Sequence, residues 1–252
     1  MQNDAMLENP PKLKTKGVEA VDKALRILSL FGSGNPVLSL GEISERSGLV
    51  KSSALRLLIS LQNAGFIAMT EDRRYTIGVE MFRIGRVYQQ SFQLEALVRP
   101  VLQNIVRQTG ESGSYFRREG DRRVCLYRED SDQPLREHVI EGEAVEIGKG
   151  AAGHVFKEFG QFSGDVPIAP EVLARLPIVV LGERGPDIAG ISAPVYAFNQ
   201  GMIGAIALSG PRSRFVQERM DGLKHLVLQS ASQLSGALRS NFYQRLAVPE
   251  NS

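Results

Sequence analysis

The stretch from Ser39 to Gly78 limits most strongly what this chain can fold into. It opens on Ser39-Leu40-Gly41-Glu42, in which a serine hydroxyl and a glutamate three residues later can satisfy each other's free backbone donors. The helix that starts there is expected to end at Gly48, because glycine readily adopts the left-handed conformation that ends a helix. The sequence therefore predicts a short helix with well-defined ends, followed by a tight turn.

A second helix is expected to start at Lys51 and to end at Gly65. Its apolar side chains recur at helical spacing, which predicts one buried face. That face consists of Ala54, Leu57, Leu58, Leu61 and Ala64. The opposite face is polar and carries no acidic residue, and it consists of Ser53, Arg56, Ser60 and Asn63.

Two short strands are expected next, Phe66 to Thr70 and Arg74 to Ile77. The turn between them is charged, with Arg73 and Arg74 at or beside its tip. The order of these elements is that of a winged helix-turn-helix: a helix, a tight turn, a polar-faced helix and a basic hairpin. The fragment Val18 to Phe31 is a further helical pattern that can pack behind the pair.

This arrangement favours DNA binding, because a helix of this width fits the major groove and its first turn carries hydroxyls and positive charge. Short two-helix units also occur in domains that bind only protein, and a polar helix face is often merely solvated. The basic hairpin and the preceding helix favour DNA. The expected DNA-binding residues are Lys51, Ser52, Ser53, Arg56, Ser60, Arg73, Arg74 and Lys16.

The net charge of +2 becomes informative when the chain is divided after residue 78. The first 78 residues hold 10 Lys and Arg against 8 Asp and Glu, whereas the remainder holds 20 of each. The excess is small, so phosphate contacts would have to be multiplied by pairing subunits. Residues 1–16, which include three alternating lysines, are either a flexible basic arm that follows phosphates or a tail with no role.

The composition fits a globular protein of one large or two ordinary domains, since 42% of the 252 residues are hydrophobic and 23% are charged. No apolar run approaches the roughly 18 residues that a membrane-spanning helix needs. Cys125 is the single cysteine, which excludes an intramolecular disulfide and a cysteine-based metal cluster. We therefore expect a cytoplasmic protein with no membrane partner.

The remainder of the chain alternates between helical and strand patterns, and this predicts an α+β domain with helices flanking a mixed or antiparallel sheet. Pro100 is expected to bend or break the helix that contains it. The expected helices are 79–90, 94–109, 154–159, 170–176 and 216–243. The expected strands are 112–116, 124–129, 135–141, 178–181, 191–196 and 202–209.

No catalytic site is evident, because the three histidines lie on different expected elements and without metal-ligand spacing. We expect no catalytic residue, no metal and no cofactor. The glycines of segment 148–153 can instead allow a ligand to approach the backbone, and the helix start that follows offers free N–H groups to an anion. Lys149 would add a point charge there. The alternative is close helix–sheet packing beside a solvated lysine.

Several segments together resemble the IclR family of bacterial transcriptional regulators. The resemblance covers nearly everything from Gly17 to about Tyr243, and the order and spacing of the segments make it specific. They are Ala24 to Leu28, Glu42 to Leu58, Leu61 to Gly65, Tyr75 to Gly78, Ser192 to Tyr196 and Ala207 to Pro211.

The resemblance implies a winged helix-turn-helix over residues 17–78, a linker helix over 79–91 and a GAF-like α+β domain over 92–252 that binds an effector and oligomerises. It also implies a homodimer or dimer of dimers on palindromic double-stranded operator DNA. The implied effector is a small molecule, in this family often an organic acid, which points to a carboxylate. The implied effector-binding residues are Lys149, Gly150, Ala151, Ala152, Ile188, Gly190, Ala207 and Ser209.

Two departures from the family pattern, at 148–154 and in a shorter segment between Phe159 and Ile191, leave an alternative open. In that alternative the chain is a DNA-binding regulator whose C-terminal domain has lost its ligand and only oligomerises. A third hypothesis, an enzyme with the helix-turn-helix as an interaction module, would require turnover of a substrate without DNA binding.

Overall fold

The computed structural model describes residues 17–32, 36–91 and 94–244, and the expected basic arm at 1–16 lies outside them. The chain divides into two compact units, residues 1–92 and 93–252. None of the helices in the described part of the chain has the length and apolar character that crossing a membrane requires.

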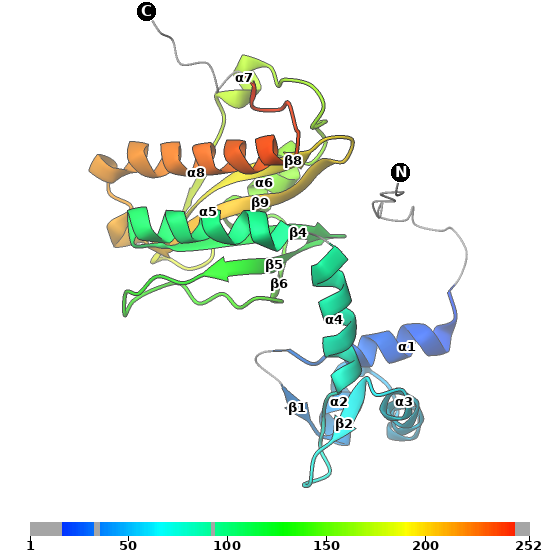
Figure 1. Ribbon diagram of the computed structural model, residues 1–252. Helices are drawn as coiled ribbons and strands as arrows, with labels where there is room; N and C mark the ends of the chain where they lie inside the picture. The colour runs from blue at the N-terminus through cyan, green and yellow to red at the C-terminus, as the bar shows by residue number, and fades with distance from the viewer. Residues whose placement is uncertain (1–16, 33–35, 92–93, 245–252) are drawn as a thin grey trace, which may run out of the picture. The chain divides into compact units, whose positions relative to one another are not determined.

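The first unit contains four helices and a small sheet among its described residues (Figure 1). The helices are α1 (Glu19–Leu28), α2 (Leu40–Ser47), α3 (Lys51–Asn63) and α4 (Val79–Ser91). The strands are β1 (Val37–Leu38), β2 (Ile67–Met69) and β3 (Tyr75–Ile77), arranged antiparallel in the order β1-β3-β2. This is a winged helix-turn-helix, in which β2 and β3 form the wing.

The local signals for α2 are confirmed. The Ser39 hydroxyl accepts a hydrogen bond from the backbone N–H of Glu42 at 3.3 Å, and the Glu42 carboxylate accepts one from the N–H of Ser39 at 2.8 Å. Gly48 ends the helix with φ +70°. Gly78 closes the wing for a different reason, because a Cβ at this position would overlap the carbonyl group of Gly65.

The core of this unit is built around Ile27, Ile43 and Leu58, all fully buried. One expectation about it is wrong, because Ala64 is exposed, and Val21 and Leu25 of α1 also remain more than half exposed. The reason is geometric, since a single helix carries more apolar residues here than one packed face can cover.

The second unit is built on one antiparallel sheet of six strands in the order β6-β5-β4-β9-β8-β7. The strands are β4 (Ser112–Glu119), β5 (Arg122–Glu129), β6 (Ala144–Glu146), β7 (Ile178–Leu181), β8 (Ile188–Ala197) and β9 (Gly201–Pro211). The helices are α5 (Leu94–Thr109), α6 (Gly150–Phe159), α7 (Pro170–Leu173), α8 (Gln217–Ala237) and a 3-10 turn at Arg212–Arg214.

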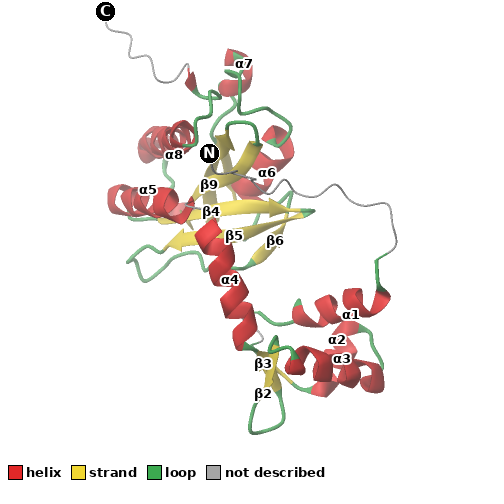
Figure 2. Ribbon diagram, turned by 45° about the vertical axis from the view of Figure 1, so that its right-hand side comes forward, coloured by secondary structure: helices red, strands yellow, loops and turns green. Residues whose placement is uncertain are grey.

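Helices cover both faces of this sheet. In Figure 2, α5 and α8 lie side by side on one face and α6 lies on the other. Eight of the ten residues of β8 and seven of the eleven residues of β9 are therefore buried, and the two strands consist mostly of apolar or small residues without polar alternation. The α+β prediction is confirmed.

Several details of the second unit differ from the sequence-based expectation, among them the start of α6, which is Gly150 and not His154. Leu135 to Glu141 is not a strand but an irregular loop, and β6 forms directly after it. The last helix ends at Ala237 and not at Tyr243. Pro100 does not break α5, because its ring is exposed while the buried side chains on the opposite side, such as Val98 and Leu102, hold the helix against the sheet.

Candidate DNA-binding surface and effector cavity

Helix α3 is held in place by a tight turn and by its apolar face. Ala54, Leu58 and Leu61 are buried in the core of the first unit. The Ser44 hydroxyl donates to the carbonyl of Leu49 at 2.6 Å, which fixes the turn between α2 and α3. The first turn of α3 contains no acidic residue, and the N-cap residue Val50 supplies no side-chain acceptor. The first backbone N–H groups of α3 are thus suited to donate hydrogen bonds to phosphate oxygens.

The structure exposes four of the five α3 residues that the sequence assigned to DNA: Lys51, Ser52, Arg56 and Ser60. Ser53 is half-buried. The Ser60 hydroxyl donates to the carbonyl of Arg56 at 3.2 Å, so this hydroxyl is partly engaged within the helix.

Two apolar residues of the same helix were missed by the sequence reading. Leu55 is 39% exposed and Ile59 is 49% exposed, and their i, i+4 spacing sets them on one side of α3. The sequence did contain an indication of this, because α3 has more apolar residues than the single buried face requires. Such side chains can contact thymine methyl groups in a major groove.

The two wing arginines have different environments. Arg73 lies at the tip of the wing with φ +58° and is exposed. Arg74 instead points back into its own unit, where its guanidinium donates to the carbonyl of Val37 at 3.2 Å and pairs with the Glu42 carboxylate at 3.3 Å. Arg74 therefore ties the wing to α2. Lys16, the remaining expected DNA contact, lies outside the described residues.

Glu42 serves two partners at once. The backbone and hydroxyl hydrogen bonds at Ser39, helped by Arg74, lower the pKa of the Glu42 carboxyl to about 2. The carboxylate is therefore charged throughout the neutral range, and it links the start of α2 to the wing.

The second unit contains a cavity beside the N-terminal end of α6. Its walls come from α6, β4, β5 and β7 to β9, from the loop that follows β7 and from the loop that precedes β6. Its volume is about 40 Å³, which is room for roughly three water molecules. Six of the eight residues expected to bind an effector line this cavity, namely Gly150, Ala152, Ile188, Gly190, Ala207 and Ser209.

The other two expected residues do not line the cavity. Ala151 is buried behind it, where a Cβ at Gly190 would lie 3.6 Å from the Ala151 methyl group. Lys149 is exposed and precedes α6 as its N-cap, without a capping hydrogen bond from its side chain. The positive charge at the cavity is therefore supplied by other residues.

The cavity wall carries four charged residues that the sequence reading missed: Arg123, Glu137, Glu183 and Arg184. They come from a strand and two loops that are far apart in the sequence, so no local spacing connects them. Arg184 pairs with Glu137, with Nη1 and Oε1 2.7 Å apart. The Glu183 carboxylate accepts the backbone N–H of Gly150 at 2.9 Å and also contacts His154 at 2.9 Å. These hydrogen bonds lower the pKa of the Glu183 carboxyl.

Arg123 is the most unusual member of the group, because its side chain is buried with only 1% exposed. Its Nη1 donates to the carbonyl of Glu146 at 2.7 Å, and its guanidinium lies 5.3 Å from the centre of the Phe116 ring. Its Nε has no hydrogen-bond partner among the residues that the structure describes. Burial, together with repulsion from Arg184, lowers the pKa of Arg123 to about 10.

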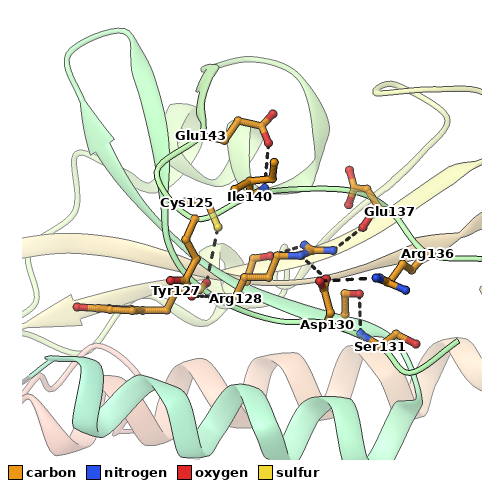
Figure 3. A network of polar contacts seen from close by, with 12 residues as sticks. Cys125, Tyr127, Arg128, Asp130, Ser131, Arg136, Glu137, Ile140 and Glu143 are labelled. Atoms are coloured by element: carbon orange, nitrogen blue, oxygen red, sulfur yellow. Dashed lines mark hydrogen bonds and ion pairs between the residues drawn. The ribbon is translucent and has the colours of Figure 1, made fainter. Parts of the chain in front are cut away.

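A second buried arginine holds the loop that carries Glu137 (Figure 3). Arg128 donates to the carbonyl of Glu137 at 2.5 Å, to the hydroxyl of Ser114 at 2.8 Å and to the carboxylate of Asp130 at 2.7 Å. Its backbone N–H donates to Glu141 at 2.7 Å. The loop before β6 is thus fixed to β4 and β5 by hydrogen bonds, and this fixes one wall of the cavity.

Two family descriptions match the chain, one in each unit. The IclR helix-turn-helix domain matches residues 20–70, and the C-terminal domain of the bacterial transcriptional regulator IclR matches residues 178–236. Together with the winged helix-turn-helix, they place the chain among helix-turn-helix transcriptional regulators. It belongs to the IclR family, as its sequence resemblance indicated.

Similar proteins cover both units. The HTH-type transcriptional regulator KipR of Bacillus subtilis is 21% identical over 86% of this chain and 96% of its own length. An IclR transcriptional regulator from Alicyclobacillus acidocaldarius has the same fold, with a TM-score of 0.72 and 21% identity over 88% of this chain and 99% of its own. An IclR homologue from Microbacterium hydrocarbonoxydans was solved in complex with 4-hydroxybenzoate. It gives a TM-score of 0.70 at 15% identity, over 87% of this chain and 99% of its own.

Proposed function

We propose that this regulator binds operator DNA sequence-specifically through α3 and that a small carboxylate in the cavity of the second unit controls this binding. The observation that carries the proposal is the pairing, in one chain, of an exposed non-acidic α3 face with a cavity that holds a buried arginine, Arg123, beside a helix N-terminus. Each unit thus offers a surface suited to one of the two partners.

For the DNA, we assign Lys51, Ser52 and Ser53 to phosphates or bases near the groove entrance, and Arg56 to a base edge. A long arginine in the second turn of a recognition helix can make the bidentate contact to guanine that dominates specific readout. Arg73 at the wing tip is assigned to a phosphate. Arg74 is assigned to positioning of the wing, since its guanidinium is already bonded to Glu42 and Val37.

A homodimer follows from the size of the DNA contact. One unit offers few cations, and affinity for DNA rises with the number of phosphates neutralised. Helices α1 and α4 each leave large apolar side chains exposed, among them Val21, Leu25 and Phe82. Such surfaces favour contact with a second copy. Effector binding would then favour one dimer geometry and with it one spacing of the two α3 helices, which operator half-sites must match.

For the effector, we assign a carboxylate to the end of the cavity formed by the start of α6. The IclR homologue solved with 4-hydroxybenzoate shows that a protein of this fold takes up a carboxylate. The six cavity-lining residues that the sequence assigned to an effector are small, apolar or singly hydroxylated, so the backbone and the arginines would supply most of the polar contacts.

The small size of the cavity favours the alternative in which the second unit only oligomerises. A volume of about 40 Å³ is far smaller than the roughly 300–1,000 Å³ of typical ligand pockets. A ligand must therefore be very small, or the wall must move to admit it.

The test uses the full-length chain and labelled duplexes from its own promoter. We expect tighter binding to promoter duplex than to a scrambled duplex of equal length, and a change in that affinity on adding one of a panel of small carboxylates. Thermal denaturation with the same panel provides a second readout, because a ligand that binds only the folded state raises the melting temperature. Equal affinity for both duplexes would refute sequence-specific binding. If no carboxylate changes either readout, the oligomerising alternative is favoured.

A further inference from the structure

Arg123 is a buried cation that forms no ion pair among the described residues, although the nearby Glu137 carboxylate attracts it. Among the described residues, the two carboxylates of the cavity wall are bonded elsewhere, Glu137 to Arg184 and Glu183 to the N–H of Gly150 and to His154. Arg123 has one neutral acceptor, the carbonyl of Glu146, and an aromatic ring beside it. A charged group in this position loses hydration that its protein contacts do not replace.

The guanidinium of Arg123 lies close to the first turn of helix α6. A Cβ at Gly153 would lie 2.9 Å from Nη1 of Arg123, and a Cβ at Gly150 would lie 3.7 Å from its Nη2. The guanidinium therefore lies against the first turn of α6, whose N-terminal end carries partial positive charge. Position 153 must lack a side chain for this approach, whereas a Cβ at position 150 would make ordinary contact with the guanidinium.

We propose that Arg123 is the residue that binds the acidic group of the effector, with its Nε and Nη2 as the donors. The proposal rests on the proposed function and deepens it by naming the anchoring residue and the charge that the ligand must carry. Arginine is suited to this role, because its planar fork donates two parallel hydrogen bonds to a carboxylate.

The proposal also explains why the charged guanidinium of Arg123 is buried at the cavity despite the cost of its desolvation. A ligand carboxylate would supply the missing acceptor for Nε and would offset the repulsion between Arg123 and Arg184. The remaining wall near Val180, Ile188 and Leu208 is apolar, so an uncharged ligand of the same shape would leave Arg123 unpaired and would bind poorly.

The experiment compares each carboxylate with its own amide, in the wild-type chain and in two variants. The probes are acetate, propionate and 4-hydroxybenzoate, each beside acetamide, propionamide or 4-hydroxybenzamide, and dissociation constants are measured by calorimetric titration. Arg123→Gln removes the charge, and Arg122→Gln removes a neighbouring arginine that is exposed on the same strand. We expect at least one carboxylate to bind the wild-type chain and the Arg122 variant alike, about tenfold or more tighter than its amide.

Arg123→Gln should weaken the binding of that carboxylate about tenfold or more, because glutamine cannot donate charge-assisted hydrogen bonds to it. The affinity for the amide should change much less. Circular dichroism checks that the variant is folded. If it is not, Arg123→Lys keeps the charge but not the fork, and it should weaken the carboxylate selectively.

Three results would overturn the proposal, and they separate it from the proposed function. Equal carboxylate affinity in the wild-type chain and Arg123→Gln would remove Arg123 as the anchor while leaving effector control intact. Equal affinity for carboxylate and amide in the wild-type chain would refute an anionic requirement. Binding of no probe by the wild-type chain, while promoter DNA is bound, would refute both the anchor and carboxylate control.

Discussion

Replacing Arg128 by methionine should destabilise the second unit by a predictable amount. The Arg128 side chain is only 4% exposed and joins the Glu137 carbonyl, the Ser114 hydroxyl and the Asp130 carboxylate. Methionine has a similar length but no donors. Asp130 is 47% exposed and can turn to water, whereas the carbonyl and the hydroxyl are left without their charged partner in a buried position.

The magnitude follows from those two groups. Each buried polar group that loses its partner costs about 1–3 kcal/mol, and the desolvation of the guanidinium that is avoided offsets part of the sum. We expect a net loss of about 2–4 kcal/mol in the free energy of unfolding. For a unit of this size, 1 kcal/mol shifts the melting temperature by about 2–4 °C, so the shift should be about 5–15 °C.

The assay is differential scanning calorimetry of the full chain, with Arg136→Ala as the control. Arg136 also contacts Asp130, at 3.8 Å, but its side chain is 42% exposed, so its loss should cost under about 0.5 kcal/mol. In the double variant Arg128→Met, Ser114→Ala, about 1 kcal/mol should be recovered, since the stranded hydroxyl is gone. An Arg128→Met protein that melts within about 1 °C of wild type would refute this reasoning.

Three further predictions concern the two sites. Arg56→Ala should weaken binding to promoter duplex by about 1–3 kcal/mol and binding to scrambled duplex by less. Fluorescence anisotropy measures both affinities, with the exposed Arg107→Ala variant as the control. Equal losses on both duplexes would indicate that Arg56 contacts only a phosphate. Because the Glu42 carboxyl has its pKa lowered to about 2, its stabilisation is complete above its ordinary value of 4.5 and is lost as the pH falls from there towards 2. Acid unfolding of the first unit should therefore be steeper in wild type than in Glu42→Gln, and identical acid profiles would contradict the linkage. Gly153→Ala should displace Arg123, whose Nη1 would lie 2.9 Å from the new methyl group, and so weaken carboxylate binding in calorimetry; unchanged affinity would show that the guanidinium can move without loss.

The DNA-binding unit was predictable to a large extent, because its signals are local. The Ser39–Glu42 capping box, Gly48 at the end of α2 and the apolar stripe of α3 act within a few residues, and the structure contains each of them. The limits of prediction were also physical. Nothing near Arg74 in the sequence indicates that its guanidinium meets Glu42, which lies 32 positions earlier.

The cavity was predictable only in part. Gly150, Gly190 and Ser209, three of the residues that the sequence assigned to an effector, do line it. Its charges were not predictable, because Arg123 reads as one more basic residue in a charged strand end. Its burial depends on α6, whose glycines admit it.

By itself, the sequence determined the ends of α2, which face of α3 is polar and the family to which the chain belongs, since each depends on local spacing and order. Only the tertiary structure decided that Arg123, Glu137 and Arg184 meet at one cavity and that Lys149 stays outside it. The physical reason is that desolvation and charge pairing act between groups close in space, and pairing of β4 with β5 and β9 brings together segments that are distant along the chain.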